Sequence, residues 1–477
     1  MEHFWRWCKR KPLVASLIAA LVVLVAVGLA GALWESHRVQ GDRALLRRAN
    51  LSDQERARLA AEQTKNPAAY EAYLRGRAFA FAGGSQLVES DPDGAIRSFQ
   101  EAVKLDPSFA QAWAYLSRVQ SERYWGEALD PSPARLAAAK EALDHALALG
   151  PDLPETHLAL GYYRYYGQRD FTVALTEFRQ AEQGLPDDFD ATFAIATIQR
   201  RLGHWDEAIA KLRRAIELAP RNVHAYNQLA LTYEALRRFP EALAAIDRVL
   251  AWDPANTSAL GLKAGAFWAT GNLQAVEPLL ANPGISPRTR ALQALFQRRY
   301  AEAIQILSDA IATENRGRPS RKQKLLLALS QQRAGDIAAA RATYQKAAQD
   351  FQRELGTVVP DSPAEAGAHA ALGLAHAGLG EEVSAIAEGR KAMAIIPISK
   401  DPVDGPDLEG DMAQVYALLG DADHAVAILK RLLQIPYPSM YPGVITPALL
   451  RIDPVWDQIR NDPRFQELAT EKNREFE

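Results

Sequence analysis

Apolar residues recur along this chain at fixed distances before a series of prolines. Five helix-like segments end just before a proline, and the last three intervals are 35, 34 and 34 residues: Pro107, Pro151, Pro186, Pro220 and Pro254. Twelve, eight and five residues before each proline stand a small, a large and a second smaller apolar residue, as in Ala208, Leu212 and Ala215. This spacing places the three side chains on one face of a helix. The pattern predicts repeated helices that pack closely against a neighbour.

A second pattern precedes these helices and shares one register from copy to copy. Its members are Trp113-x-x-Leu116-Ser117, His157-x-x-Leu160-Gly161, Thr192-x-x-Ile195-Ala196 and Tyr226-x-x-Leu229-Ala230. Together the two patterns resemble the tetratricopeptide repeat, in which W-x-x-L-G-x-x-Y is followed by A-x-x-x-F-x-x-A and a proline. The match is specific because several positions agree over several copies. His157, Arg164, Thr192 and Gln199 depart from the pattern and weaken single copies only.

Weaker copies continue the repeat to residue 436. Second helices are indicated by the spacing around Leu307, Tyr344, Gly389 and Leu429. Because neighbouring pairs of such repeats stack, the resemblance implies a right-handed superhelix with a concave groove. The sequence therefore predicts an all-α solenoid of roughly nine to ten helix pairs over residues 66–436.

The ends of such a solenoid need to be covered. Asp453-Pro454 and Asp462-Pro463 each read as a helix N-cap followed by proline at the first helical position. We expect residues 437–477 to form a loop and capping helices, with Trp456, Ile459 and Phe465 against the last repeat.

An uncharged apolar run precedes the repeats. Residues 13–34 would span about 33 Å as a helix at ~1.5 Å per residue, enough to cross a bilayer core of about 30 Å. A cleaved signal peptide is the alternative, since Ala30-Gly31-Ala32 matches a cleavage site. Basic residues crowd the first side of the run, so the positive-inside rule favours a cytoplasmic N-terminus. We expect a short basic cytoplasmic tail (1–12), a transmembrane helix (13–34), a linker helix (35–65) and a periplasmic solenoid in a bacterial inner membrane.

The anchor, the first repeat helix and the tail also resemble bacterial membrane-anchored repeat proteins. In these, a Ser/Thr kinase or a winged-helix regulator precedes one span and an exported repeat domain. The segments that carry this likeness are "WRWCKRKPLVASL", "AAYEAYLRGRAFAF" and "LRIDPVWDQIRNDPRFQELA". No kinase motif is present, so the resemblance implies the sensing or docking half without its effector.

The composition argues against several functional classes. The net charge is −3 and the pI is about 6.4, so no basic field invites nucleic acid. The only cysteine is Cys8, which excludes a disulfide framework or a cysteine zinc site within one chain. HExxH, GxSxG and GxxxxGK[ST] motifs are absent. His369 and His376 lie at repeat-register positions, where packing explains them better than metal binding. We therefore expect no enzyme, no cofactor and no metal.

Known tetratricopeptide folds bind ligands with the inward face of each first helix. Transferring that register to this chain selects Arg118, Glu122, Tyr162, Tyr165, Tyr166, Phe193, Arg200, Arg201, Asn227, Gln228, Glu234 and Trp268. Tyrosine and arginine are enriched at protein interfaces. The four tyrosines of "LGYYRYYGQ" favour a partner-binding patch, although Tyr163 lies off the register. Packing of these tyrosines between repeats is the alternative. The family's carboxylate clamp is not matched, since Leu158 and Tyr162 stand where lysine and asparagine would be.

These observations predict a membrane-anchored protein–protein interaction scaffold. We expect protein partners, in a membrane or envelope complex that the concave groove binds or stabilises. The alternative is the sensory or docking half of a signalling system, whose kinase or regulator is a separate or lost chain.

Overall fold

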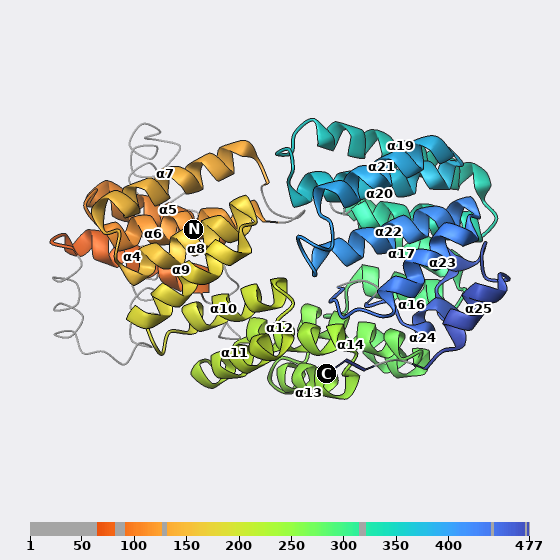
Figure 1. Ribbon diagram of the computed structural model, residues 1–477, viewed down its shortest axis with the longest axis horizontal. Helices are drawn as coiled ribbons and strands as arrows, with labels where there is room; N and C mark the ends of the chain where they lie inside the picture. Colours follow the sequence, from red (N-terminus) through yellow and green to blue (C-terminus); the bar gives the residue numbers. More distant parts are fainter. Residues whose placement is uncertain are drawn as a thin grey trace, which may run out of the picture.

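The computed structural model describes residues 64–81, 91–125, 131–313, 321–439, 443–472 and 475–476. Within these ranges the chain forms 22 α-helices joined by short turns, and no β-strand (Figure 1). The predicted all-α repeat fold is confirmed.

The helices are numbered from α4 in chain order. The first part contains α4 (Pro67–Phe81), α5 (Pro92–Leu105), α6 (Ala110–Tyr124), α7 (Pro133–Leu149), α8 (Pro154–Tyr162), α9 (Phe171–Gly184), α10 (Phe189–Arg201), α11 (Trp205–Leu218), α12 (Val223–Ala235), α13 (Phe239–Trp252) and α14 (Thr257–Ala269). The second part contains α15 (Glu277–Leu280), α16 (Pro287–Phe296), α17 (Tyr300–Thr313), α18 (Arg321–Arg333), α19 (Ile337–Leu355), α20 (Pro363–Leu379), α21 (Glu382–Ile395), α22 (Asp404–Leu419), α23 (Ala422–Leu432), α24 (Pro447–Ile452) and α25 (Pro463–Thr470). A π-helix, η2 (Tyr163–Gln168), and two 3-10 helices, η3 (Leu273–Val276) and η4 (Pro454–Trp456), complete the set.

Consecutive helices pack as antiparallel pairs, and the predicted repeat register lies in the core between them. The register residues of five second helices are all at most 2% exposed: Ala95, Phe99, Ala102, Ala139, Leu143, Ala146, Ala174, Phe178, Ala181, Ala208, Leu212, Ala215, Ala242, Ile246 and Val249. The glycine of the first helix has a matching role. A Cβ added to Gly161 would lie 2.4 Å from the Phe178 ring, so only glycine lets that ring pack against the helix.

One turn position alternates between glycine and arginine. The turns after α10 and α14 contain Gly203 and Gly271, both at φ +78, in the left-handed region that glycine tolerates best. At the same position, 34 residues away in each case, stand Arg169 (φ 54) and Arg237 (φ 57). A non-glycine residue in this region is strained, so both arginines call for a compensating contact.

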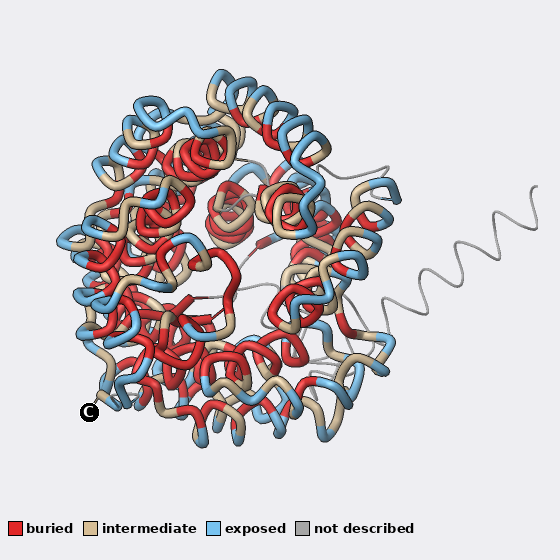
Figure 2. Tube along the Cα trace, turned by 90° about the vertical axis from the view of Figure 1, so that its right-hand side faces the viewer, coloured by how far each residue is buried: buried red, intermediate tan, exposed pale blue. Residues whose placement is uncertain are grey.

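The repeats follow a curve that brings distant parts of the chain face to face. In Figure 1, α11 and α13 lie along the lower edge, and α10, α12 and α14 lie nearer the middle. The helix pairs run round nearly a full turn when the molecule is viewed from the side (Figure 2). As a result, the segment before α22 reaches the turn after η2, over 230 residues earlier in the sequence.

The last segment of the chain covers the final repeats. Asp453 and Asp462 each accept a backbone hydrogen bond as the N-cap of η4 and α25. Trp456, Ile459 and Phe465 are at most 2% exposed and pack in one cluster with α22 and α23. The same segment also returns to the middle of the solenoid, which the sequence did not predict. The hydroxyl of Thr446 donates to the carbonyl of Ala269 (2.6 Å), and the backbone N–H of Phe476 donates to that of Leu236 (3.0 Å).

No helix in the described ranges is both long and apolar enough to cross a membrane. The expected tail, span and nearly all of the linker helix (1–12, 13–34 and 35–65) lie outside these ranges. On this finding, the predicted single-pass location in a bacterial inner membrane, with a cytoplasmic N-terminus and periplasmic repeats, is wrong. The physical reason is that a span needs about 20 consecutive apolar residues, and no described helix provides them.

Candidate partner-binding site

The predicted binding residues lie on the first helices of consecutive pairs, α6, α8 with η2, α10, α12 and α14. Most of them are buried; the exceptions, all only partly exposed, are Glu122, Tyr166 and Gln228. The structure divides them into residues that the chain itself already binds and residues whose polar atoms have no partner.

Arg118 belongs to the first class. Its guanidinium lies 2.9 Å from the carboxylate of Asp190 and 3.0 Å from that of Glu122. It also covers the ring of Tyr162, with 4.7 Å between the guanidinium carbon and the ring centroid. Arg118 therefore fixes α6 against α8 and α10 instead of presenting a free charge.

The tyrosine-rich segment mostly packs inside the solenoid. Tyr162 lies edge-on to Phe178 at 5.0 Å and Tyr165 edge-on to Phe171 at 5.8 Å, and both are at most 4% exposed. Tyr166 stacks on Tyr165 at 4.3 Å and stays partly exposed. The packing alternative thus describes Tyr162 and Tyr165, and Tyr166 alone retains surface for a partner.

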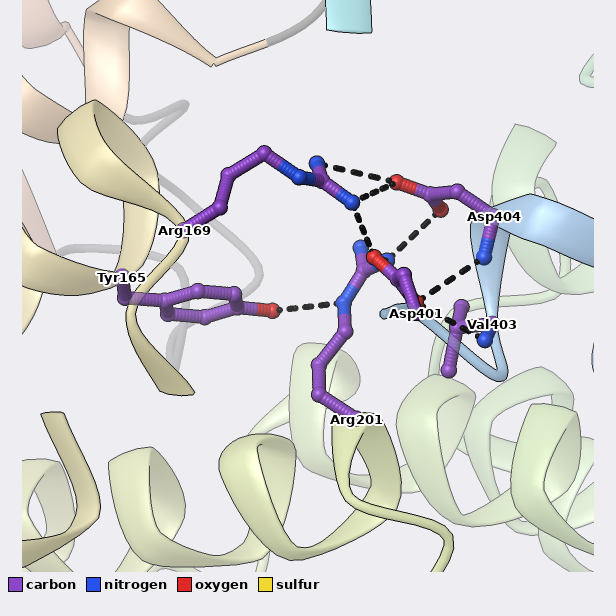
Figure 3. A network of polar contacts seen from close by, with 6 residues as sticks. All are labelled: Tyr165, Arg169, Arg201, Asp401, Val403 and Asp404. Carbon is purple, nitrogen blue, oxygen red and sulfur yellow. Dashed lines mark hydrogen bonds and ion pairs between the residues drawn. The ribbon is translucent and has the colours of Figure 1, made fainter. Parts of the chain in front are cut away.

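Arg201 is bound by the second half of the chain. Figure 3 shows Arg201 and Arg169 converging on Asp401 and Asp404, which precede and begin α22. The Nη1 atom of Arg201 lies 2.8 Å from Asp401 and 2.7 Å from Asp404. Arg169 contacts both carboxylates, and the Nε of Arg201 donates to the hydroxyl of Tyr165 (3.2 Å). We call Arg169, Arg201, Asp401 and Asp404 the aspartate bridge.

Burial and charge are balanced within the aspartate bridge. The Asp401 side chain is fully buried, and its second oxygen accepts the backbone N–H groups of Val403 (2.8 Å) and Asp404 (3.1 Å). Burial alone would raise the pKa of Asp404, but the guanidinium groups of Arg201 and Arg169 hold it below its ordinary value. The ion pairs of Arg169 and Arg201 with both aspartates tie the two parts of the solenoid together.

A second contact of this kind lies at Arg237. Its guanidinium donates to three main-chain carbonyls, those of Leu432 (3.1 Å), Ile435 (3.2 Å) and Ile445 (3.3 Å). Arg237 is 1% exposed, and the ring of Phe476 lies 4.7 Å from its guanidinium carbon. We call these contacts the carbonyl bridge. Sequence reasoning missed both bridges; the arginine at a glycine turn position was the one local signal.

Four of the predicted residues have buried polar atoms without a hydrogen-bond partner in the described chain. These atoms are Nε and Nη1 of Arg200, Oδ1 of Asn227, Oε1 of Gln228 and Oε1 of Glu234. Arg200 is 7% exposed, Asn227 6% and Glu234 2%. Burial lowers the pKa of Arg200 to about 10 and raises that of Glu234 to about 8. We call these residues the unpartnered set.

Trp268 lies apart from the other predicted residues. It is fully buried, its indole N–H donates to Gln293 (2.7 Å), and it packs edge-on against Phe296 at 5.3 Å. Its contacts are those of a core residue.

The described ranges contain no candidate metal-binding cluster. No group of three His, Cys, Asp or Glu side chains there could hold a metal ion. His369 and His376 lie against different carboxylates, those of Glu388 and Glu381, each at 2.5 Å.

Comparisons with known proteins agree with the repeat pattern. One model of the tetratricopeptide repeat matches residues 199–266, and another matches residues 163–223 and 325–397. The chain therefore matches the tetratricopeptide repeat over these segments. The predicted likeness to kinase-linked or regulator-linked sensors, and the predicted membrane or envelope complex, are not shown by these matches.

Several solved structures are similar to the chain at low identity. A tetratricopeptide repeat protein from Parabacteroides merdae is 18% identical over 51% of this chain and 93% of its own, with a TM-score of 0.37. A thermophilic protein from Thermus thermophilus, TTC0263, is 21% identical over 40% and 98%, with a TM-score of 0.32. The human IFIT1 dimer with PPP-AAAA is 16% identical over 69% and 72%, with a TM-score of 0.40. A comparison with curated proteins found no match.

Proposed function

Because the chain matches the tetratricopeptide repeat over these segments, we propose that it is a protein–protein interaction scaffold without catalytic activity. It binds a segment of a partner protein against α10 and α12. The observation that carries this proposal is the unpartnered set, since more than about 90% of buried polar groups in folded proteins have a hydrogen-bond partner. Four such residues on two neighbouring first helices favour a partner protein that supplies the hydrogen bonds missing among the described residues.

An extended peptide fits the chemistry of these residues. Asn227 uses its amide N–H₂ to donate to Ser258 (3.1 Å), which leaves its carbonyl oxygen free to accept. Gln228 also has a free carbonyl oxygen. Each can accept a backbone N–H from a peptide, a group that every residue except proline provides. Tyr166 on the neighbouring element η2 is partly exposed, whereas Phe193 of α10 is buried against Phe189 and His224.

Peptide selection on the full chain tests this proposal. Random linear dodecapeptides displayed on phage are selected on the immobilised protein, and selected peptides are then synthesised and titrated by fluorescence anisotropy. We expect the double variant Asn227→Ala/Gln228→Ala to bind them roughly thirtyfold more weakly, since each of the two lost hydrogen bonds contributes about 1 kcal/mol.

Gln183→Ala is the matched control, because Gln183 is exposed on the second helix α9. The control should bind the selected peptides as the unaltered chain does. Enrichment of no peptide, or equal binding by both variants, would exclude binding at α10 and α12.

A further inference from the structure

The charges around the aspartate bridge do not cancel. Three arginines, Arg169, Arg200 and Arg201, lie near two carboxylates, Asp401 and Asp404. Arg169 and Arg201 each contact both aspartates, so these four side chains neutralise one another. Arg200 has no ion pair within the described ranges and leaves one positive charge uncompensated.

Burial makes this excess charge costly. Arg200 is 7% exposed, and its buried Nε and Nη1 atoms have no hydrogen-bond partner among the residues that the structure describes. Burial, together with the neighbouring charge of Arg201, lowers its pKa to about 10. A buried charge is normally paired. Arg200 therefore keeps a guanidinium ready for an anion that the described part of the chain does not supply.

We propose that Arg200 binds a carboxylate of the partner segment, the side chain of an aspartate or a glutamate. This inference rests on the proposed peptide-binding function and names one residue type of the peptide. The carboxylate charge of −1 cancels the single excess positive charge. A phosphate group, at about −1.5 to −2 near pH 7, would leave negative charge beside Asp401 and Asp404.

The position of Arg200 sets where the acidic residue lies in the peptide. Arg200 is in the last turn of α10, one residue before Arg201 of the aspartate bridge. Asn227 and Gln228 lie on the next first helix, α12. A peptide that crosses these helices thus places its acidic side chain on α10 and its backbone on α12.

The selected dodecapeptides provide the test. In the unaltered full chain we expect one peptide position to be enriched in aspartate or glutamate. A selected peptide with glutamate at that position is compared with twins that contain glutamine or phosphoserine there. The glutamate peptide should bind roughly tenfold or more tightly than the glutamine twin, as expected for a hydrogen bond to a charged group, and also more tightly than the phosphoserine twin.

The variant Arg200→Gln should abolish the preference for glutamate over glutamine. Arg179→Gln is the matched control, because Arg179 is exposed on the second helix α9 and should leave the preference intact. Enriched peptides without an acidic preference would overturn this inference and leave the proposed function standing. Tighter binding of the phosphoserine twin would also overturn it. Failure to enrich any peptide would instead count against the proposed function itself.

Thermal unfolding of the unliganded protein separates a binding arginine from a structural one. Removing an uncompensated buried charge should leave the melting temperature of Arg200→Gln unchanged or raise it. A clearly lowered melting temperature would mean that the folded chain uses Arg200 for its own stability, and would overturn the proposal.

Discussion

Two bridges tie the early repeats to the last part of the chain, and they differ in the groups that receive the arginines. In the aspartate bridge, Arg169 and Arg201 bind two carboxylates. In the carbonyl bridge, Arg237 binds three main-chain carbonyls. Arg169 and Arg237 occupy the same left-handed turn position of two repeats, 68 residues apart.

The comparison shows that an arginine at one turn position of the repeat can bind the returning chain in two ways, through carboxylates or through main-chain carbonyls. Glycine stands at this position where no side chain bridges to the returning chain, although a Cβ added to Gly203 would lie 4.0 Å from Pro402 and one added to Gly271 would lie 3.3 Å from Ala448. Arg169 and Arg237 stand at the same position despite the backbone strain, and their side chains bind the returning chain. A third case is Arg298 (φ 63), whose guanidinium lies 2.6 Å from Asp457. The aspartate bridge depends on the ionisation of its carboxylates, whereas the acceptors of the carbonyl bridge are main-chain carbonyls that do not ionise.

The largest loss of stability is expected when a substitution breaks the aspartate bridge. Asp401→Asn keeps a side-chain oxygen for the backbone N–H groups of Val403 and Asp404 but removes the buried negative charge. Because Arg169 and Arg201 then lose half of their compensation, we expect the free energy of unfolding to fall by about 3–5 kcal/mol. Urea unfolding followed by circular dichroism measures it.

Asp187→Asn is the control for this substitution. Asp187 pairs with Arg214 at the surface, with its side chain 77% exposed, so its loss should cost under about 1 kcal/mol. Similar small losses for both variants would show that the aspartate bridge does not hold the two parts together.

The next largest loss of stability is expected when a substitution breaks the carbonyl bridge. Arg237→Met keeps most of the apolar volume but leaves three carbonyls without their donor. We expect a loss of about 2–4 kcal/mol, since an unsatisfied buried acceptor costs about 1–3 kcal/mol and relaxation recovers part of it. The same urea experiment with Arg238→Met, next in sequence and partly exposed, should show under about 1 kcal/mol. A loss no greater than that of the control would mean that the carbonyls find other donors.

Acid should separate the two bridges, with a smaller effect. The folded-state pKa of Asp404 is lowered, because the arginines offset its burial. Its contribution to stability is therefore present above the ordinary aspartate pKa of about 4 and is lost as the pH falls through the folded-state value. We expect the stability difference between the unaltered chain and Asp404→Asn to shrink towards zero over that range. The stability difference between the unaltered chain and Arg237→Met should stay constant over the same pH range. A parallel decline would contradict the distinction between the aspartate bridge and the carbonyl bridge.

Local periodicity predicted much of the fold, but it did not predict the pairing of residues far apart in the sequence. The register Ala174, Phe178 and Ala181 is fully buried as expected, because helix periodicity and the repeat are both visible in the sequence. Arg201 was correctly placed on a first helix, but its partner Asp401 lies 200 residues away. One sequence contains no signal for such a pairing. Trp268 shares the predicted register and still lies in the core, because Gln293 and the returning C-terminal segment cover α14.

The smallest expected effect is the cost of backbone strain at the turn position of Arg169. Arg169→Gly and Arg169→Ala both remove the side chain from the aspartate bridge, so they differ mainly in backbone strain. Glycine adopts φ 54 freely and alanine does not, and we expect Arg169→Gly to be the more stable by about 1 kcal/mol. At Arg179, inside the regular helix α9, the order should reverse, with alanine the more stable by about 1 kcal/mol. The same order at both positions would mean that the strain at Arg169 is not real, and that arginine needs no bridge to stand where other repeats have glycine.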